Sequence, residues 1–155
     1  IFVIMPFSEK TEEYATGYFD EVYSSLIVPA AAQAGYSSFT AQRSGSDVIH
    51  STIVREIENA EVILADLTEH NPNVLFELGL AFAFRKKVAL IRSTGTKEIF
   101  DVDNLLRVYD YDRNLWKSTV ERDIPNIAKH IEATLQMKGD SNYLDILLGK
   151  SNKLG

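Results

Sequence analysis

The sequence predicts an α/β domain, a three-layer sandwich in which helices cover both faces of a mainly parallel five-stranded sheet. Short apolar runs alternate with longer segments whose apolar residues recur at helical spacing. The chain has 155 residues, of which 45% are hydrophobic and 25% charged, a composition typical of a globular domain that buries a full core. We expect this domain to span residues 1–138, followed by a short helix and tail over residues 139–155.

Five runs are predicted to form the strands. Ile1–Met5 is apolar throughout and stops at Pro6, which is typical of a strand buried on both faces. Glu61–Asp66 is similarly apolar and ends in a carboxylate. The other strands are expected at Tyr36–Thr40, Lys87–Arg92 and Val108–Tyr111.

Helices are predicted between the strands. Thr11 is a good cap for the first, which is expected to bend near Pro29 and to end at Gly35. Ser46 or Asp47 is the predicted cap of the second helix.

Two further helices are predicted. Asn71 is the predicted cap of the third, with Pro72 at its first position, where a missing N–H costs nothing. The last is expected over Asn114–Lys138, with an interruption near Pro125. Its Glu121–Asp123 charges are expected on a solvated face, and Trp116 is expected to pack.

Residues 74–84 contain one charge, Glu77, in an otherwise apolar helix. A helix that is apolar all round has no wet face and is expected to be buried, which places Glu77 in the interior or at its edge. An unpaired buried carboxylate is energetically costly, so one is expected only where it has a partner, a raised pKa or a functional role. A structural pairing with an arginine such as Arg85 or Arg92 is the alternative, and the residues alone do not separate the two.

A flavodoxin-like strand order is the simplest topology for this alternation. Ligands of such sheets bind outside the carboxyl ends of the strands at the switch point. That rule brings together the loops at residues 5–8, 43–47 and 66–73. Glu77 lies about a turn and a half into the helix that leaves the third loop, with Asn73 one helical turn before it.

Asp66 and Glu77 together suggest a paired-carboxylate site. Cleavage of a bond to an anomeric carbon passes through an oxocarbenium-like state, which one carboxylate attacks or stabilises while a second group handles protons or hydroxyls. Asp66 and Glu77 are therefore the catalytic candidates. The substrate-binding candidates are Pro6, Phe7, Ser8, Arg43, Asp47, His70, Asn71 and Asn73.

Three of these candidates have simpler structural explanations. Arg43 could bind a phosphate or pair with an acidic side chain, and Asp47 could bind a sugar hydroxyl or only cap a helix. His70 could contact a ligand or only solvent. Outside this set, Tyr109 and Tyr111 could stack on a base, although packing in the core or at a sheet edge is the stronger expectation.

Composition argues against other classes of function. The net charge of −6 and the lack of a basic run argue against nucleic-acid binding, and no apolar stretch reaches the ~20 residues needed to cross a membrane. Cysteine is absent and the three histidines lack ligand spacing, so we expect no metal. The sequence has no GxGxxG motif and no Walker loop, and we expect no cofactor. A cytoplasmic location is expected because cysteine and a visible signal peptide are both absent.

The motifs Ala65-Asp66-Leu67-Thr68, Asn71-Pro72-Asn73-Val74 and Glu77-Leu78-Gly79 resemble the signature of the nucleoside 2-deoxyribosyltransferase-like superfamily. The opening Val3-Ile4-Met5-Pro6-Phe7 is similar to its first strand and substrate loop. The resemblance covers residues 1–101 and extends to TIR-like domains, some of which cleave NAD. It implies a flavodoxin-like fold, Glu77 as nucleophile, Asp66 in the active site and a homo-oligomer.

Three hypotheses follow from the sequence. The first is an N-glycosidase, hydrolase or transferase, acting on a nucleoside, nucleotide or NAD-like dinucleotide. The second is a module that senses a nucleotide without turnover, and the third is a structural oligomerisation domain.

Overall fold

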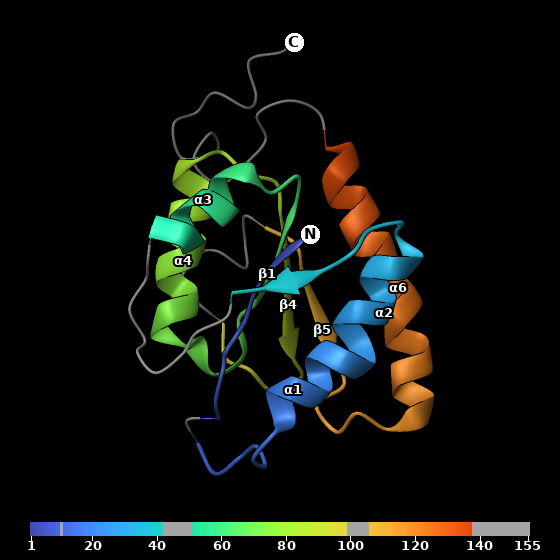
Figure 1. The fold of residues 1–155 in the computed structure, drawn as a ribbon. Coiled ribbons are helices and arrows are strands. Elements are labelled where there is room, and N and C mark those ends of the chain that lie inside the picture. The colour runs from blue at the N-terminus through green and yellow to red at the C-terminus, as the bar shows by residue number, and fades with distance from the viewer. Residues whose placement is uncertain (10, 42–50, 99–105, 138–155) are drawn as a thin grey trace.

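A computed structural model describes residues 1–9, 11–41, 51–98 and 106–137 of the chain (Figure 1). All strand pairs in its five-stranded sheet are parallel, and the strand order is β2-β1-β3-β4-β5. The predicted α/β class and flavodoxin-like order are therefore confirmed. The predicted segment 139–155 lies outside the described residues. The strands are β1 (Phe2–Ile4), β2 (Phe39–Thr40), β3 (Ile63–Asp66), β4 (Val88–Ser93) and β5 (Val108–Tyr111).

Helices cover both faces of the sheet, and each layer has its own apolar core (Figure 1). Because side chains alternate along a strand, Val3 joins one core while Phe2 and Ile4 join the other. The first layer contains α1 (Tyr18–Val22), the π-helical turn η1 (Tyr23–Ile27), α2 (Val28–Gln33) and α6 (Lys117–Gln136), and the second contains α3 (Ser51–Asn59) and α4 (Pro72–Ala83).

Helix α1 begins later than the sequence predicts. Thr11 does not cap it; the Thr11 hydroxyl instead donates to the Glu69 carboxylate at 3.2 Å. The helix starts after Gly17, whose φ of 86° is a backbone conformation that glycine adopts at low cost. Glu9 supplies the capping group, since its carboxylate accepts from the backbone N–H of Phe19 at 3.1 Å. Glu9 lies ten residues before Phe19, so no local pattern marks it as the capping residue.

Close to Pro29, where the sequence suggests a bent or shortened helix, the structure has η1, the π-helical turn that precedes α2. Pro29 lies in the first turn of α2, where its missing N–H is tolerated. A π turn inserts one extra residue into the hydrogen-bonding ladder and so reorients the helix. The helix is not shortened at Pro29, because α2 continues to Gln33.

Helix α6 corrects three expectations. It runs through Pro125 without interruption, held on one side of the proline by the buried Ile127 and Ile131. Asp123 is not solvated but 1% exposed, and its carboxylate accepts from the Tyr109 hydroxyl at 2.7 Å. Trp116 does not pack, since 63% of it is exposed.

Helix α4 is half buried, not wholly buried as its composition predicts. Its inner face, which includes Val74, Glu77, Leu78 and Ala81, packs against β1 and β3. Its outer face leaves Phe76 58% exposed. A sandwich of three layers covers only one side of each helix, so an apolar sequence alone does not bury the other. The prediction of a fully buried helix is wrong in this respect.

We predict that Glu9→Ala lowers the free energy of unfolding at neutral pH by about 1 kcal/mol or less, the scale of a lost helix cap. Partial burial acts to raise the pKa of the Glu9 carboxyl, but its bonds with backbone N–H groups outweigh this and lower the pKa from 4.5. The contribution of Glu9 to the free energy of unfolding is therefore present above pH 4.5, and it is lost as the pH falls through the lower pKa of the folded state. Urea unfolding of Glu9→Ala and the wild type across this pH range measures the contribution. A difference in free energy of unfolding that grew towards acid would contradict Glu9 as the cap of α1.

Candidate functional site

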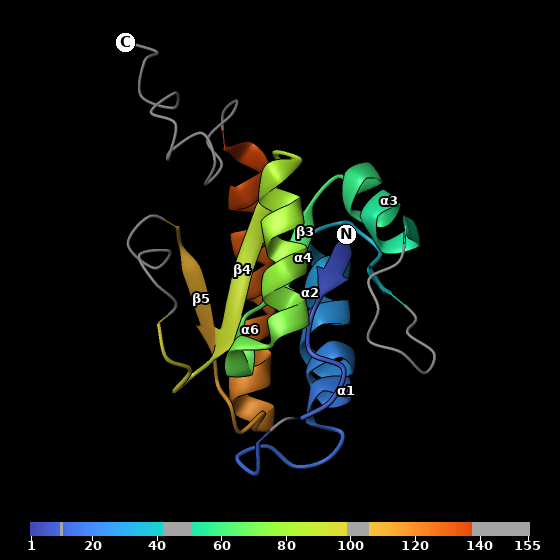
Figure 2. The same ribbon diagram turned by 90° about the vertical axis from the view of Figure 1, so that its left-hand side faces the viewer.

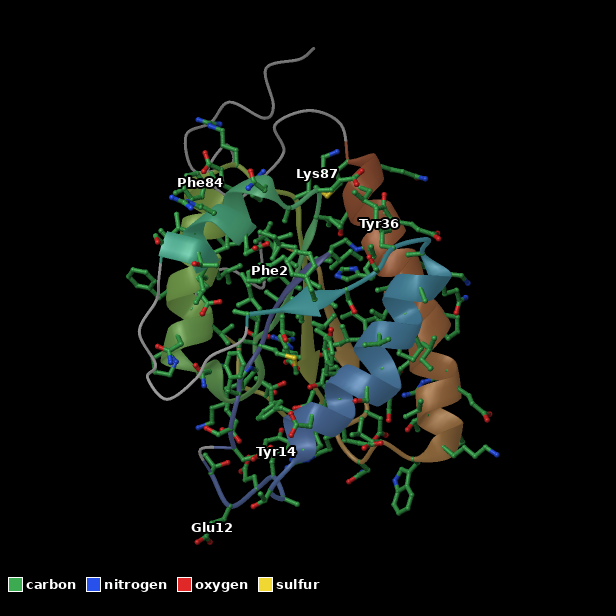
Figure 3. All side chains as sticks on the ribbon, in the orientation of Figure 1. Phe2, Glu12, Tyr14, Tyr36, Phe84 and Lys87 are labelled. Carbon is green, nitrogen blue, oxygen red and sulfur yellow. The ribbon has the colours of Figure 1, made fainter. Side chains whose placement is uncertain are left out.

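The carboxyl ends of the strands gather polar side chains at one edge of the sheet. Asp66 ends β3, Ser93 ends β4 and Tyr111 ends β5. Tyr14, in the segment that leads to α1, reaches the same edge, near the end of the molecule where Glu12 is labelled in Figure 3. In parallel sheets with this strand order, the edge formed by the carboxyl ends is where ligands bind.

Asp66 is fully buried, and hydrogen bonds satisfy both of its carboxylate oxygens. Oδ1 accepts from the Thr68 backbone N–H at 3.0 Å and from the Thr68 hydroxyl at 2.6 Å. Oδ2 accepts from the Tyr111 hydroxyl at 2.7 Å. The carboxylate therefore ties the turn after β3 to the end of β5.

Burial raises the pKa of Asp66, and the bonds from Thr68 and Tyr111 oppose this by stabilising the charged form. Burial likewise raises the pKa of Tyr111, and the neighbouring Asp66 carboxylate raises it further. The Tyr111 hydroxyl consequently remains a proton donor to Asp66 throughout the physiological range.

The same contacts extend to β4 and to the segment before α1. The Thr68 hydroxyl accepts from the Ser93 backbone N–H at 3.0 Å. The Ser93 hydroxyl lies 2.6 Å from that of Tyr14 and 3.1 Å from that of Thr96. Four segments distant in sequence thus meet in one polar network, which we call the Asp66 network: Tyr14, Asp66, Thr68, Ser93, Thr96 and Tyr111.

The turn that follows Asp66 sets the start of α4. Glu69 and His70 both have positive φ, 63° and 49°, a conformation uncommon for residues with a side chain. Asn71 then caps α4, because its side-chain oxygen accepts from the N–H groups of Asn73 at 2.9 Å and Val74 at 3.3 Å. The predicted cap is confirmed, and Pro72 follows at the first turn as expected.

Glu77 lies on the inner face of α4 and is 1% exposed. This face packs on β1 and β3. The topological switch point lies between these two strands, because the chain continues from β1 to β2 on one side of the sheet and from β3 to β4 on the other. At 1.5 Å per residue, Glu77 is about 9 Å along the helix axis from Asn71. The predicted burial of this carboxylate is confirmed, on a helix that packs against the two strands flanking the switch point.

A pocket of about 200 Å³ opens at the same edge, and eight residues within the described ranges line it. Tyr14 belongs to both the pocket and the Asp66 network, which joins the two. The His70 ring nitrogen Nε2 donates to the Lys97 carbonyl at 2.6 Å in the pocket wall. The lining residues are Thr11, Glu13, Tyr14, Glu69, His70, Gly95, Thr96 and Lys97.

Of the predicted substrate-binding residues that the structure describes, His70 alone lines this pocket. Pro6 is buried after β1, whereas Phe7 is 43% exposed and Ser8 is exposed. Asn73 is half-buried one turn ahead of Glu77. Asp66 and Glu77 are not among the lining residues. Arg43 and Asp47 lie outside the described residues.

Sequence reasoning missed most of the Asp66 network. Tyr111 was expected in the core and is indeed fully buried, but its bond to Asp66 was not foreseen. Ser93 and Tyr111 end their strands just as Asp66 does, and the rule that singled out Asp66 applies equally to them. Tyr14 carries no such signal, because its position depends on where α1 begins.

No group of three or more potential metal-ligating side chains occurs within the described ranges, and none of the helices described there is long and apolar enough to cross a membrane. No protein-family model matches the chain, and no curated protein is significantly similar to it. The resemblance to the nucleoside 2-deoxyribosyltransferase-like superfamily therefore stays a prediction.

We predict that Tyr111→Phe lowers the free energy of unfolding by about 2 kcal/mol at neutral pH, the scale of a buried hydrogen bond to a charged group. Loss of this donor raises the pKa of Asp66 further above its ordinary value of 3.8. A carboxyl group whose pKa is higher in the folded state loses stabilising free energy as the pH rises past its unfolded pKa towards its folded pKa. The loss of free energy of unfolding in Tyr111→Phe is therefore larger at neutral pH than in acid.

Urea unfolding measures this deficit, with Tyr36→Phe as the control for loss of a tyrosine hydroxyl outside the Asp66 network. Equal stability of Tyr111→Phe and the wild type at neutral pH would contradict the structural importance of the bond.

Proposed function

We propose that this protein cleaves the N-glycosidic bond of a nucleoside, nucleotide or NAD-like dinucleotide, as a hydrolase or a transferase. The observation that carries the proposal is the buried carboxylate of Glu77, on the helix that packs against β1 and β3 at the switch point. A carboxylate shielded from water is poorly solvated and therefore more reactive towards an anomeric carbon. The resemblance of its surrounding motifs supports the same chemistry.

In the proposed reaction, a Glu77 oxygen bonds to the anomeric carbon as the bond from that carbon to the base nitrogen breaks. The base leaves with the electron pair of that bond and takes up a proton. Water, or an acceptor base in a transferase, then attacks the same carbon, and its bond to Glu77 breaks. The carboxylate is regenerated and the acceptor loses a proton.

The geometry of Asp66 supports a positioning role. Its oxygens are already engaged by Thr68 and Tyr111, and the side chain has no exposed surface. We propose that Asp66 holds the turn from which α4 and Glu77 depart, and so acts on the reaction through that turn.

The surrounding residues suit substrate contact. Phe7 and Ser8 offer an exposed apolar ring and a hydroxyl after β1, next to β3, and we assign them to the wall around the base or sugar. Asn73 is the candidate for binding a sugar hydroxyl, and His70 contributes from the pocket wall. Arg43 is proposed to bind phosphate and Asp47 a sugar hydroxyl.

One observation favours a second candidate function, a nucleotide-sensing module without turnover. Glu77 is 1% exposed and is not among the described residues that line the 200 Å³ pocket, so a ligand can occupy that pocket without contacting Glu77. Such a ligand contacts Tyr14, and through it the Asp66 network. Sharing a fold with enzymes does not establish catalysis.

We predict that Glu77→Gln, which removes the charge at constant shape, lowers base release by at least about 1,000-fold, as loss of a nucleophile does. The exposed Glu58 on α3 provides the control, and Glu58→Gln is expected to keep wild-type activity. Chromatography of pure protein incubated with nucleosides, nucleotides and NAD measures the released base.

Undiminished base release by a folded Glu77→Gln variant would reject the nucleophile. A ligand-induced rise in melting temperature without base release by the wild type would instead support the sensor. A cytoplasmic location remains an expectation.

A further inference from the structure

The pocket at the carboxyl edge of the sheet carries charges of both signs in its wall. Glu13 and Glu69 contribute carboxylates, and Lys97 contributes an ammonium group. None of the described residues that line the pocket is an aliphatic hydrophobic residue. In Figure 2 the segment before α1, which contains Glu13, lies at the lower end of the molecule, towards which β4 runs. The wall therefore suits a small polar ligand.

Hydrogen bonds hold the segments of the wall together. The Thr11 hydroxyl donates to the Glu69 carboxylate at 3.2 Å, which joins the segment before α1 to the turn after β3. The His70 ring donates to the Lys97 carbonyl at 2.6 Å, which joins this turn to the loop after β4. The pocket is therefore formed before a ligand binds, which lowers the entropic cost of binding.

A second cation lies next to the loop that carries Lys97. Gly95 in this loop has a φ of 90°, and a Cβ added to it would lie 3.3 Å from Nη1 of Arg113. The Arg113 guanidinium carbon is also 4.9 Å from the centre of the Tyr14 ring. The positive groups thus belong to the loop after β4 and the turn after β5, whereas the carboxylates come from the segment before α1 and the turn after β3.

Two hydroxyls of the wall share one buried partner. The Ser93 hydroxyl lies 2.6 Å from that of Tyr14 and 3.1 Å from that of Thr96. A hydroxyl oxygen has two accepting lone pairs, so Tyr14 and Thr96 can each accept from a ligand while they keep the bond to Ser93. A ligand with N–H donors is thereby favoured, and it contacts the Asp66 network through Tyr14.

The volume of the pocket limits the ligand further. Its 200 Å³ is the space of about seven water molecules at ~30 Å³ each, and it is less than the ~300 Å³ of the smallest pockets for drug-sized ligands. A dinucleotide is too large for this space. Phosphate groups are also disfavoured by the two carboxylates of the wall.

We propose that this pocket binds a free α-amino acid, a zwitterion that matches both signs of charge in the wall. The ammonium group lies against the carboxylates of Glu13 and Glu69, and the carboxylate lies against Lys97. Glu77 is not among the described residues that line the pocket, so the proposal does not depend on the proposed enzymatic activity.

Isothermal titration calorimetry of the 155-residue chain with each standard amino acid tests the proposal. At least one amino acid is expected to bind with a Kd below about 1 mM. The amine that lacks its carboxylate and the acid that lacks its ammonium group are each expected to bind at least about tenfold more weakly, because each leaves one sign of charge in the wall unmatched. Absence of binding by every amino acid, or equal binding of the amine or the acid, would overturn the proposal.

Charge-removing variants locate the bound amino acid. Glu13→Gln and Lys97→Gln change exposed side chains and are each expected to weaken binding at least about tenfold. The matched controls are Glu98→Gln and Lys117→Gln, which are exposed and outside the set of described lining residues, and these are expected to keep the wild-type Kd.

Hydrogen exchange with and without the amino acid gives a second localisation that requires no variant. Protection is expected in peptides that cover residues 11–14 and 95–97, and none is expected in α3. Unchanged affinity of Glu13→Gln and Lys97→Gln, or protection confined to α3, would contradict the assigned pocket. Binding of AMP that Lys97→Gln weakens would place a nucleotide there instead, as the sensor function requires, and would also overturn the proposal.

Discussion

Burial of the Asp66 carboxylate is the constraint on which the functional edge of this fold depends. A charge with no exposed surface is tolerated only when its oxygens are satisfied, and Thr68 and Tyr111 do this from β3's own turn and from the far strand β5. Ser93 and Tyr14 extend the same contacts to β4 and to the segment before α1. Since the turn after Asp66 leads directly into α4, the network also determines where Glu77 lies.

Helix α4 combines two environments in one apolar segment. Its inner face buries the single charge of the helix against β1 and β3, and its outer face leaves Phe76 and its neighbours in solvent. One apolar segment therefore places a carboxylate in a dry interior on one side and leaves an uncharged apolar face in solvent on the other.

The class of fold was predictable because it rests on local signals. Short local patterns predict these elements: the apolar runs predict β1 and β3, and Asn71 with Pro72 predicts the start of α4. The start of α1 and the burial of Asp123 were not, because each depends on a partner distant in sequence, Glu9 for α1 and Tyr109 for Asp123. For the candidate site, the burial of Glu77 followed from its apolar neighbours, whereas the Tyr111–Asp66 bond joins residues 45 apart and leaves no local pattern.

Glu77 as a nucleophile towards an anomeric carbon is the central claim, and its covalent intermediate tests the claim most directly. Protein quenched with acid during turnover of a nucleoside or NAD is digested, and its peptides are mapped by mass spectrometry. We predict a sugar adduct on the peptide that contains Glu77, located on that side chain by fragmentation. Release of base with the Glu77 peptide unmodified throughout the time course, or with the adduct on another residue, would contradict the account.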